Sequence, residues 1–273
     1  MSELVSSEGG PAPGSDGTRF GFFTDSSVCI GCKACEVACK EWNGVPDNVV
    51  DFTATSYDNT GSLGANAWRH VAFVEQPASA PGAGDFRWLM SSDVCKHCSS
   101  PACLEVCPTG ALFTTEFGTI VVQDDVCNGC GYCVTACPFG VIERRESDGG
   151  DWKCTMCYER MRGAKQPACA QACPTDSIQF GPLDELRARA TVRLEEVVAA
   201  GEHRAQLYGD DPHDGVGGTG ALFLLLDDPE VYRLPPDPVT PTRHLARMWA
   251  MAGAAAGALA AVLAGSLAGG RRR

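Results

Sequence analysis

The order of apolar and polar residues predicts three elements in the second half of the chain. Residues 183–200 (LDELRARATVRLEEVVAA) space their apolar side chains like an amphipathic helix that ends at Gly201. The continuous apolar run at 221–226 (ALFLLL) predicts a buried strand. The Pro-rich segment at 233–243 predicts an extended linker. We therefore expect a helix, a strand and a linker between 183 and 240.

The C-terminal segment predicts a transmembrane helix. Residues 248–268 carry no charge, and about 20 apolar residues suffice to cross roughly 30 Å of hydrocarbon. The alternative is a buried Ala-rich helix in a soluble core, because Ala inserts only weakly into bilayers. Arg243 and Arg247 precede the segment and 271–273 are all Arg, which slightly favours a cytoplasmic C-terminus. Small residues such as Gly253 and Gly257 would allow close approach of a partner helix.

The cysteine-rich region, residues 28–180, contains an internal repeat. VCIGCKAC at 28–35 returns as VCNGCGYC at 126–133, and CPTGALF at 107–113 returns as CPTDSIQF at 173–180. Short β-prone stretches (ALFTT, VIERR, SIQF) follow three of the cysteine runs, and Gly118 before TIVV suggests a hairpin. A duplication with small hairpins beside cysteine loops is expected.

Composition narrows the classes of function. The 273 residues carry a net charge of −12, which argues against nucleic-acid binding because that affinity comes mainly from Lys and Arg. The first twenty residues have neither a basic nor an apolar region of the kind found in secretory signals, so we expect 1–24 to be a flexible polar tail. Export, if it occurs, would then depend on the signal of another chain.

The sixteen cysteines carry the candidate chemistry. They form four runs of four thiols, and the Pro that follows the last Cys of three runs is typical of bacterial [4Fe-4S] ferredoxins. The first run departs from this pattern, with Lys40 in place of Pro. The runs are Cys29-x2-Cys32-x2-Cys35-x3-Cys39, Cys95-x2-Cys98-x4-Cys103-x3-Cys107, Cys127-x2-Cys130-x2-Cys133-x3-Cys137 and Cys154-x2-Cys157-x11-Cys169-x3-Cys173. The count predicts four [4Fe-4S] clusters with no thiol left over.

Spacing along the chain suggests how the runs pair. Runs two and three are close in sequence and form one dicluster module, so runs one and four pair across it. In two-cluster ferredoxins the fourth Cys of each run ligates the other cluster. The predicted ligand sets are Cys29, Cys32, Cys35 and Cys173; Cys39, Cys154, Cys157 and Cys169; Cys95, Cys98, Cys103 and Cys137; and Cys107, Cys127, Cys130 and Cys133.

Two other chemistries use paired cysteines. Structural zinc also binds Cys-x2-Cys pairs, but a zinc ribbon leaves the repeated x3-Cys-Pro unexplained. A disulfide scaffold fits less well, because a chain of this length does not need disulfides to make a core. A zinc-binding structural protein is thus the alternative from another class.

Some polar residues lie beside the predicted ligands. His97 could tune a cluster by hydrogen bonding or charge, but an exposed histidine without a role is the favoured interpretation. Lys33, Lys96 and Lys153 could raise cluster potentials or could simply be solvated.

Together with WNGVPDN at 42–48, YDNTGSLGANAW at 57–68, KCTMCYERMRGAKQPACAQACPT at 153–175 and GVGGTGALFLL at 215–225, the cysteine runs resemble the β subunit of membrane-bound respiratory formate dehydrogenase. The resemblance spans roughly residues 25–270. The runs alone also fit iron-sulfur subunits of other molybdopterin oxidoreductases or hydrogenases, and the GVGGT segment and single C-terminal helix narrow the choice.

The resemblance implies an α+β fold and an electron-transfer role without a catalytic residue. Two ferredoxin-like dicluster domains are expected, one from 25–92 with 151–182 and one inserted at 93–150, and 241–273 would anchor the chain. The partners implied are a molybdenum or tungsten pterin α subunit that oxidises formate and a cytochrome b γ subunit that reduces quinone. The bulk of the chain would lie on the outer face of the membrane, exported with an α subunit that bears a twin-arginine signal.

Overall fold

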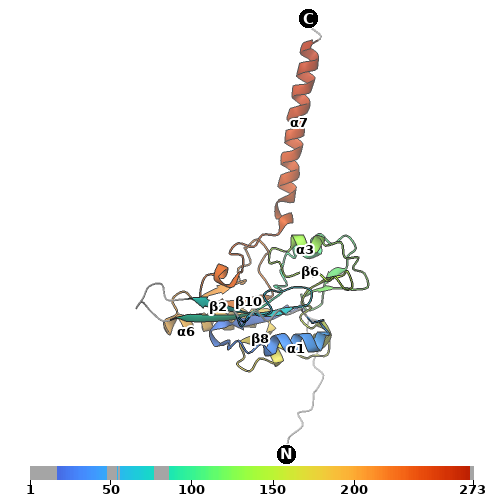
Figure 1. Cartoon of the computed structure of the whole chain (residues 1–273). Helices are drawn as coiled ribbons and strands as arrows, with labels where there is room; N and C mark the ends of the chain where they lie inside the picture. The colour runs from blue at the N-terminus through green and yellow to red at the C-terminus, as the bar shows by residue number, and fades with distance from the viewer. Residues whose placement is uncertain (1–16, 48–53, 55, 77–85, 271–273) are drawn as a thin grey trace, which may run out of the picture.

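The computed structural model describes residues 17–47, 54, 56–76 and 86–270. A mixed α and β body holds the cysteine-rich part, and one long helix, α7, projects from it (Figure 1). This confirms the expected α+β class with one apolar C-terminal helix.

A four-stranded sheet joins the two ends of the body. Its strand order is β8 (Ile178–Pro182), β1 (Phe20–Asp25), β10 (Ala221–Leu225) and β9 (Gln206–Tyr208), with β1 and β10 parallel and the other pairs antiparallel. Every residue of β10 is fully buried, which confirms the strand predicted from its unbroken apolar run. The sheet therefore unites segments that lie about 200 residues apart.

The two faces of this sheet bury different partners. On β1, Phe23 faces helix α6 (Leu183–Ala199), which packs Leu186 and Ala190 against it. Phe22 faces the opposite way, into the core that contains the cysteines. This alternation is the period-2 pattern of a strand covered on both sides. The helix predicted at 183–200 is confirmed and forms one outer layer.

Strand β1 overlaps the segment that was predicted to be an N-terminal tail. Residues 1–16 of the expected tail lie outside the described residues. Residues 20–24, also assigned to the tail, instead form most of β1, where Phe22, Phe23 and Thr24 are fully inaccessible. This part of the prediction was wrong, because the strand is stabilised by partners remote in sequence: Phe22 pairs with both Ala221 and Phe180.

Three antiparallel hairpins complete the strands: β2 (Arg69–Gln76) with β3 (Arg87–Val94), β4 (Leu112–Thr114) with β5 (Ile120–Val122), and β6 (Glu143–Arg144) with β7 (Asp151–Trp152). The predicted hairpin at Gly118 is confirmed, since Gly118 has φ +71° and donates its N–H to the Thr115 carbonyl at 3.0 Å. The β2–β3 hairpin was not predicted.

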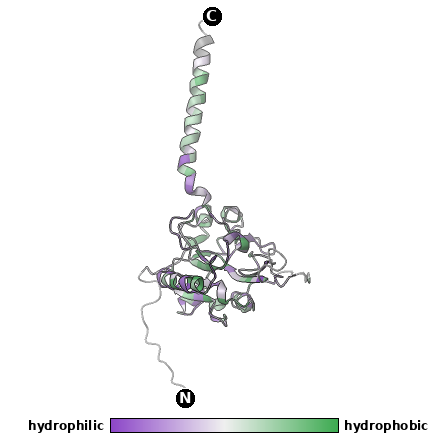
Figure 2. Ribbon diagram, turned by 90° about the vertical axis from the view of Figure 1, so that its left-hand side faces the viewer, coloured by the Kyte–Doolittle hydropathy of each residue, from purple (hydrophilic) through white to green (hydrophobic). Residues whose placement is uncertain are grey.

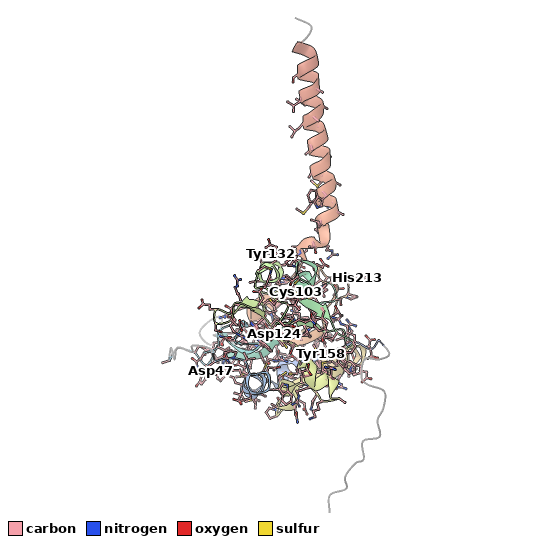
Figure 3. All side chains as sticks on the ribbon, turned by 90° about the vertical axis from the view of Figure 1, so that its right-hand side faces the viewer. Asp47, Cys103, Asp124, Tyr132, Tyr158 and His213 are labelled. Carbon is pink, nitrogen blue, oxygen red and sulfur yellow. The ribbon has the colours of Figure 1, made fainter. Side chains whose placement is uncertain are left out.

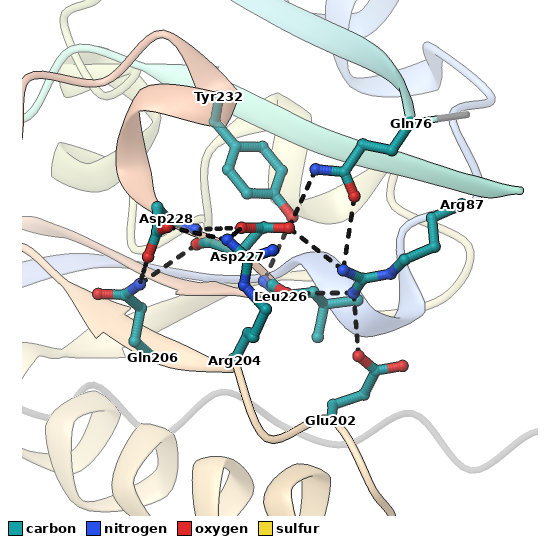
Figure 4. A network of polar contacts seen from close by, with 9 residues as sticks. All are labelled: Gln76, Arg87, Glu202, Arg204, Gln206, Leu226, Asp227, Asp228 and Tyr232. Carbon is teal, nitrogen blue, oxygen red and sulfur yellow. Dashed lines mark hydrogen bonds and ion pairs between the residues drawn. The ribbon is translucent and has the colours of Figure 1, made fainter. Parts of the chain in front are cut away.

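A polar network fixes this hairpin to the end of β10. The fully buried Asp227 carboxylate accepts hydrogen bonds from Gln76 Nε2 at 3.0 Å and Arg87 Nη1 at 3.2 Å, and pairs with Arg204 (Figure 4). Arg87 also reaches Glu202 at 3.0 Å. The buried charge is therefore compensated by two cations.

Short helices follow the cysteine loops. They are α1 (Ala34–Asn43), α2 (Ala102–Glu105), α3 (Tyr132–Ala136), α4 (Tyr158–Arg162) and α5 (Ala168–Gln171), with 3-10 turns η1 (Ser26–Val28), η2 (Pro229–Tyr232) and η3 (Pro241–His244). The duplicated loops before α1 and α3 have matching backbones. Gly31 and Gly129 have φ of 64° and 62°, and Lys33 and Gly131 have φ of 58° and 75°. The sequence repeat is thus also a structural repeat.

Helix α7 (Leu245–Gly270) confirms the predicted C-terminal helix. A candidate membrane span covers Pro241–Ser266 and has mean hydropathy 1.6, and every residue from 243 to 266 is exposed. Figure 2 shows it as an apolar rod with hydrophilic residues at its base. Because every residue from 245 to 266 is exposed, the alternative of a helix buried in the chain's own core is wrong. Residues 271–273 lie outside the described residues.

Candidate iron-sulfur centres

All sixteen cysteines lie within the described residues, and all are free thiols. We name the four predicted ligand sets groups A to D, in the order in which they were given above. The disulfide scaffold considered above is therefore not formed.

Group A lines one cavity. Cys29, Cys32 and Cys35 of the first run surround it together with Cys173 from the end of the fourth run. Burial raises the pKa of the Cys29 thiol, and the charge of Cys173 raises it further, which places these two sulfurs near each other. The structure thus brings together the first predicted set.

Group C lines a second cavity, whose wall contains Cys95, Cys98, Cys103 and Cys137. Burial and then the charges of Cys95 and Cys137 raise the pKa of Cys98 well above its ordinary value. This is the third predicted set, and it again takes its last thiol from the other run of the pair.

Group B comprises Cys39, Cys154, Cys157 and Cys169, which are all buried. Burial and the charges of the other three thiols raise the pKa of Cys39 well above its ordinary value. The side-chain amide of Asn43 lies 3.7 Å from the sulfur of Cys39 and 3.6 Å from that of Cys157, so one donor faces two predicted ligands. Sequence reasoning did not single out Asn43.

Group D is the least enclosed. Cys133 is buried, and burial, Asp151 and Cys127 raise its pKa. Cys130 is exposed and Cys107 is partly exposed, with its sulfur 3.6 Å from the hydroxyl of Thr109. The described contacts join Cys127 to Cys133 and do not by themselves place Cys107 and Cys130 beside them.

The electrostatic contacts between groups follow a line. Cys169 of group B raises the pKa of Cys35 in group A, after the larger effects of burial and Arg69. Cys95 of group C raises that of Cys154 in group B, after burial. Cys103 of group C also raises that of Cys133 in group D. The groups are therefore neighbours in the order A, B, C, D.

The order of groups A to D has a definite orientation relative to helix α7. Helix α3, which carries Cys133, lies beside the base of α7, whereas α1, which carries Cys35, lies on the far side of the body (Figure 1). In Figure 3, Tyr132 and Cys103 lie below the base of the same helix. The base is fixed to the second run, because Thr240 donates its hydroxyl to the Ser100 carbonyl at 3.0 Å. Groups C and D thus lie at the end of the body nearest the candidate membrane span, and helix α1 of group A lies on the far side.

Buried cations lie between the groups. The Arg69 guanidinium, 2% exposed, donates from Nη2 to the Cys169 sulfur at 3.2 Å and from Nη1 to the Ser92 carbonyl at 3.2 Å. Burial opposes its charge, but Cys169 and Cys35 raise its pKa above the ordinary value. Arg69 therefore joins groups A and B. A single Arg at the head of an ordinary strand gave no sequence signal for this position.

Two of the three lysines beside the predicted ligands are buried, which contradicts the alternative that they are simply solvated. Lys96 and Lys153 are each 1% exposed, whereas the side chain of Lys33 is 25% exposed and lies 3.5 Å from Glu36. Burial lowers the pKa of Lys153, but Cys95, Cys103 and Cys154 outweigh this effect and raise it. Lys153 thus lies between groups B and C as a counter-charge.

The favoured interpretation of His97 was wrong. The residue is 1% exposed, and burial, followed by Lys153, lowers its pKa well below the ordinary value, so the ring is neutral. It lines the group C cavity. Sequence spacing placed it beside two ligands but gave no information on its burial.

These features fit iron-sulfur clusters. Thiols whose pKa is raised to about 12 by burial, such as Cys35 and Cys103, lose their protons when a metal centre replaces them. Among the described residues, no three His, Cys, Asp or Glu side chains converge on a point that a single ion could occupy. Each of the two cavities is lined by four thiols, and His97, whose buried Nε2 has no hydrogen-bond partner among the described residues, lies in the wall of one of them. This arrangement fits a group larger than a single ion that brings its own hydrogen-bond acceptors.

The comparisons with known proteins agree with this geometry. Two family models, each described as a 4Fe-4S dicluster domain, match residues 28–111 and 86–183. The nitrate-inducible formate dehydrogenase iron-sulfur subunit of Escherichia coli (strain K12) is 39% identical over 218 residues, 78% of this chain and 71% of that protein. The formate dehydrogenase iron-sulfur subunit of Haemophilus influenzae is also 39% identical over 218 residues, 68% of its length.

A further relative serves another complex. The B subunit of the anaerobic dimethyl sulfoxide reductase of Escherichia coli (strain K12) is 39% identical over 170 residues, 62% of this chain and 77% of that protein. Fold, thiols and matches together define a non-catalytic electron-transfer protein that carries four [4Fe-4S] clusters. The chain belongs to the family of formate dehydrogenase iron-sulfur subunits.

Proposed function

We propose that this chain carries electrons from a molybdenum or tungsten pterin subunit that oxidises formate to a cytochrome b subunit that reduces quinone. The observation that carries the proposal is the line of four thiol groups that ends at the base of α7. A protein with clusters in series and one end at a membrane span is suited to move electrons between a soluble site and the bilayer.

We assign the ligands by group. Cys29, Cys32, Cys35 and Cys173 hold cluster A, and Cys39, Cys154, Cys157 and Cys169 hold cluster B. Cys95, Cys98, Cys103 and Cys137 hold cluster C, and Cys107, Cys127, Cys130 and Cys133 hold cluster D. The cavities support sets A and C, and the contacts around Cys39 support set B. Set D follows from the repeat and from the exchange of the fourth thiol seen in the others. The predicted division into an inserted module at 93–150 follows the same pairing.

Each cluster takes up and releases one electron, and the protein sets its potential by burial, charge and hydrogen bonds to sulfur. The residues of this chain therefore hold and insulate the clusters. Buried Arg69 and Lys153 offset the negative charge that each reduced cluster adds. No proton transfer or nucleophile is required of this chain.

For the membrane, we propose that α7 crosses the bilayer with the body on the outer face and the arginines at 271–273 in the cytoplasm. Support comes from the exposed apolar surface of α7 and from the basic residues that close the sequence. An epitope tag is placed after Arg273, and protease is added to spheroplasts, in which the outer face of the membrane is accessible. Digestion of the body with a protected tag is expected, and loss of the tag with a protected body would reverse the orientation.

The substrate is tested on the complex itself. The chain should be purified from solubilised membranes under anaerobic conditions, together with its bound subunits, and assayed for quinone reduction with formate. Formate-dependent quinone reduction is expected. The relative in dimethyl sulfoxide reductase supplies the second candidate, in which electrons flow the other way, toward dimethyl sulfoxide. Quinol-dependent reduction of dimethyl sulfoxide, without formate oxidation, would favour that candidate.

A further inference from the structure

His97 has a strained but well-fixed backbone. Its φ of 45° lies in the left-handed region, which is unfavourable for a residue with a side chain. Its carbonyl accepts hydrogen bonds from the N–H of Gly220 at 3.2 Å and from Arg19 Nη2. Gly220, directly before β10, and Arg19, directly before β1, thus hold the His97 backbone in place.

The tautomer of the ring is determined by its neighbour. The backbone N–H of Ile120 donates to His97 Nδ1 at 3.0 Å. A backbone amide is always a donor, so Nδ1 carries no proton. In a neutral imidazole the proton must then be on Nε2. His97 therefore presents an N–H at Nε2.

That N–H has no acceptor among the described residues. Nε2 is buried and makes no hydrogen bond, although the large majority of buried polar groups in proteins have a partner. The ring lines the cavity surrounded by Cys95, Cys98, Cys103 and Cys137. A cluster held by these thiols would bring sulfide and thiolate sulfurs, both hydrogen-bond acceptors, into that cavity.

We propose that His97 Nε2–H donates a hydrogen bond to a sulfur of cluster C and thereby raises its reduction potential. The reduced cluster carries one more negative charge than the oxidised one, so a donor at sulfur stabilises the reduced form more. His97 thus tunes the reduction potential of one of the four clusters. The inference rests on the ligand set of cluster C in the proposed function and not on the identity of the partner enzymes.

Two substitutions separate the two nitrogens of the ring. In His97→Asn, the side-chain oxygen can take the place of Nδ1 and accept from Ile120, and Asn tolerates the left-handed backbone, but the donor at Nε2 is lost. In His97→Gln, the longer side chain can place its amide nitrogen near the Nε2 position and keep a donor. Iron and sulfide content of each purified complex shows first that four clusters are present.

Redox titration followed by electron paramagnetic resonance (EPR) then measures each cluster. We expect His97→Asn to lower the potential of cluster C and leave those of A, B and D unchanged, with His97→Gln closer to wild type. In the wild type, reduced cluster C should show an exchangeable-proton coupling that deuterated buffer removes and that His97→Asn lacks. An unchanged potential and coupling in His97→Asn would overturn the proposal.

If the His97→Asn complex does not assemble cluster C, the wild-type complex still tests the proposed hydrogen bond. With 15N-histidine incorporated, the reduced cluster C spectrum should contain a 15N coupling. Its absence would overturn the proposal. Quinone reduction with formate is measured on the same wild-type sample. A failed hydrogen bond with intact quinone reduction contradicts only this inference, whereas lost quinone reduction contradicts the proposed function.

Discussion

Groups B and D each draw their predicted thiols from two cysteine runs, yet their surroundings differ. All four thiols of group B are buried, Asn43 faces two of them, and Arg69 donates to a third. In group D, Cys130 is exposed, and the side chains beside it are exposed as well, with Tyr132 at 60% and Val126 at 39%. A relay cluster inside the line needs insulation, whereas a terminal cluster needs a surface through which it can pass electrons on. The difference predicts that the exposed ligand Cys130 tolerates substitution better than the ligands of group B.

The largest expected effect is on the assembly of group B. Cys157→Ser removes a ligand from a buried site, and without its cluster the core around α1 and α5 contains a cavity lined by unpaired thiols. We expect almost no folded chain to accumulate. Cys130→Ser is the matched control at an exposed ligand, and it should yield folded complex that lacks only the iron of cluster D. The yield of purified complex and the iron content per chain are measured for both variants. Equal yields of the two variants would contradict the predicted difference between groups B and D.

A smaller but selective effect is expected at Arg69. Arg69→Met removes a buried cation that contacts a group B sulfur at 3.2 Å, so clusters A and B should have lower potentials while C and D do not change. The loss of the buried guanidinium also destabilises the chain, by about 3 kcal/mol if the thiolate charge is left uncompensated. Potentials followed by EPR on the purified complex give the test. Exposed Arg189 on α6 offers the control Arg189→Met. A uniform shift of all four potentials would show that Arg69 does not act locally.

The smallest effect is expected far from the clusters. Asp227→Asn weakens the network of Figure 4, because the buried carboxylate loses its charge opposite Arg87 and Arg204. These partners keep contact with water, so the loss should be about 1–3 kcal/mol, seen as a lower unfolding temperature with unchanged cluster potentials. The exposed neighbour Asp228 supplies the control, Asp228→Asn, with little effect. Altered cluster potentials in Asp227→Asn would show that this network also influences the clusters and does not act on stability alone.

The sequence predicted elements whose signals are local. The helix at 183–200, the strand at 221–226 and the C-terminal helix follow from periodicity or length, and all three formed. Strand β1 was missed because its partners lie at 178–182 and 221–224, so nothing near Phe22 shows the pairing. The β2–β3 hairpin was missed for a related reason, since its eight paired positions flank a connection longer than a tight turn.

The thiols of the site were evident from spacing, but their surroundings were not. Lys96, Lys153 and His97 are polar residue types that usually face water. Here they are buried, and the groups that compensate Lys153 belong to cysteines from three different runs. Much of the negative charge beside these cations would come from thiolates and clusters. The amino-acid composition alone therefore gives no sign of that charge. Arg69 is the clearest case, since its partners Cys169 and Cys35 lie far from it in sequence.

The direct test of the line of clusters uses Cys130→Ser in the membrane-bound complex. After mixing with formate and rapid freezing, EPR should show clusters A, B and C reduced, cluster D absent, and no reduction of quinone. Dye reduction by the catalytic subunit should persist, because it does not require the terminal cluster. Quinone reduction at the wild-type rate in a complex that lacks cluster D would contradict the account.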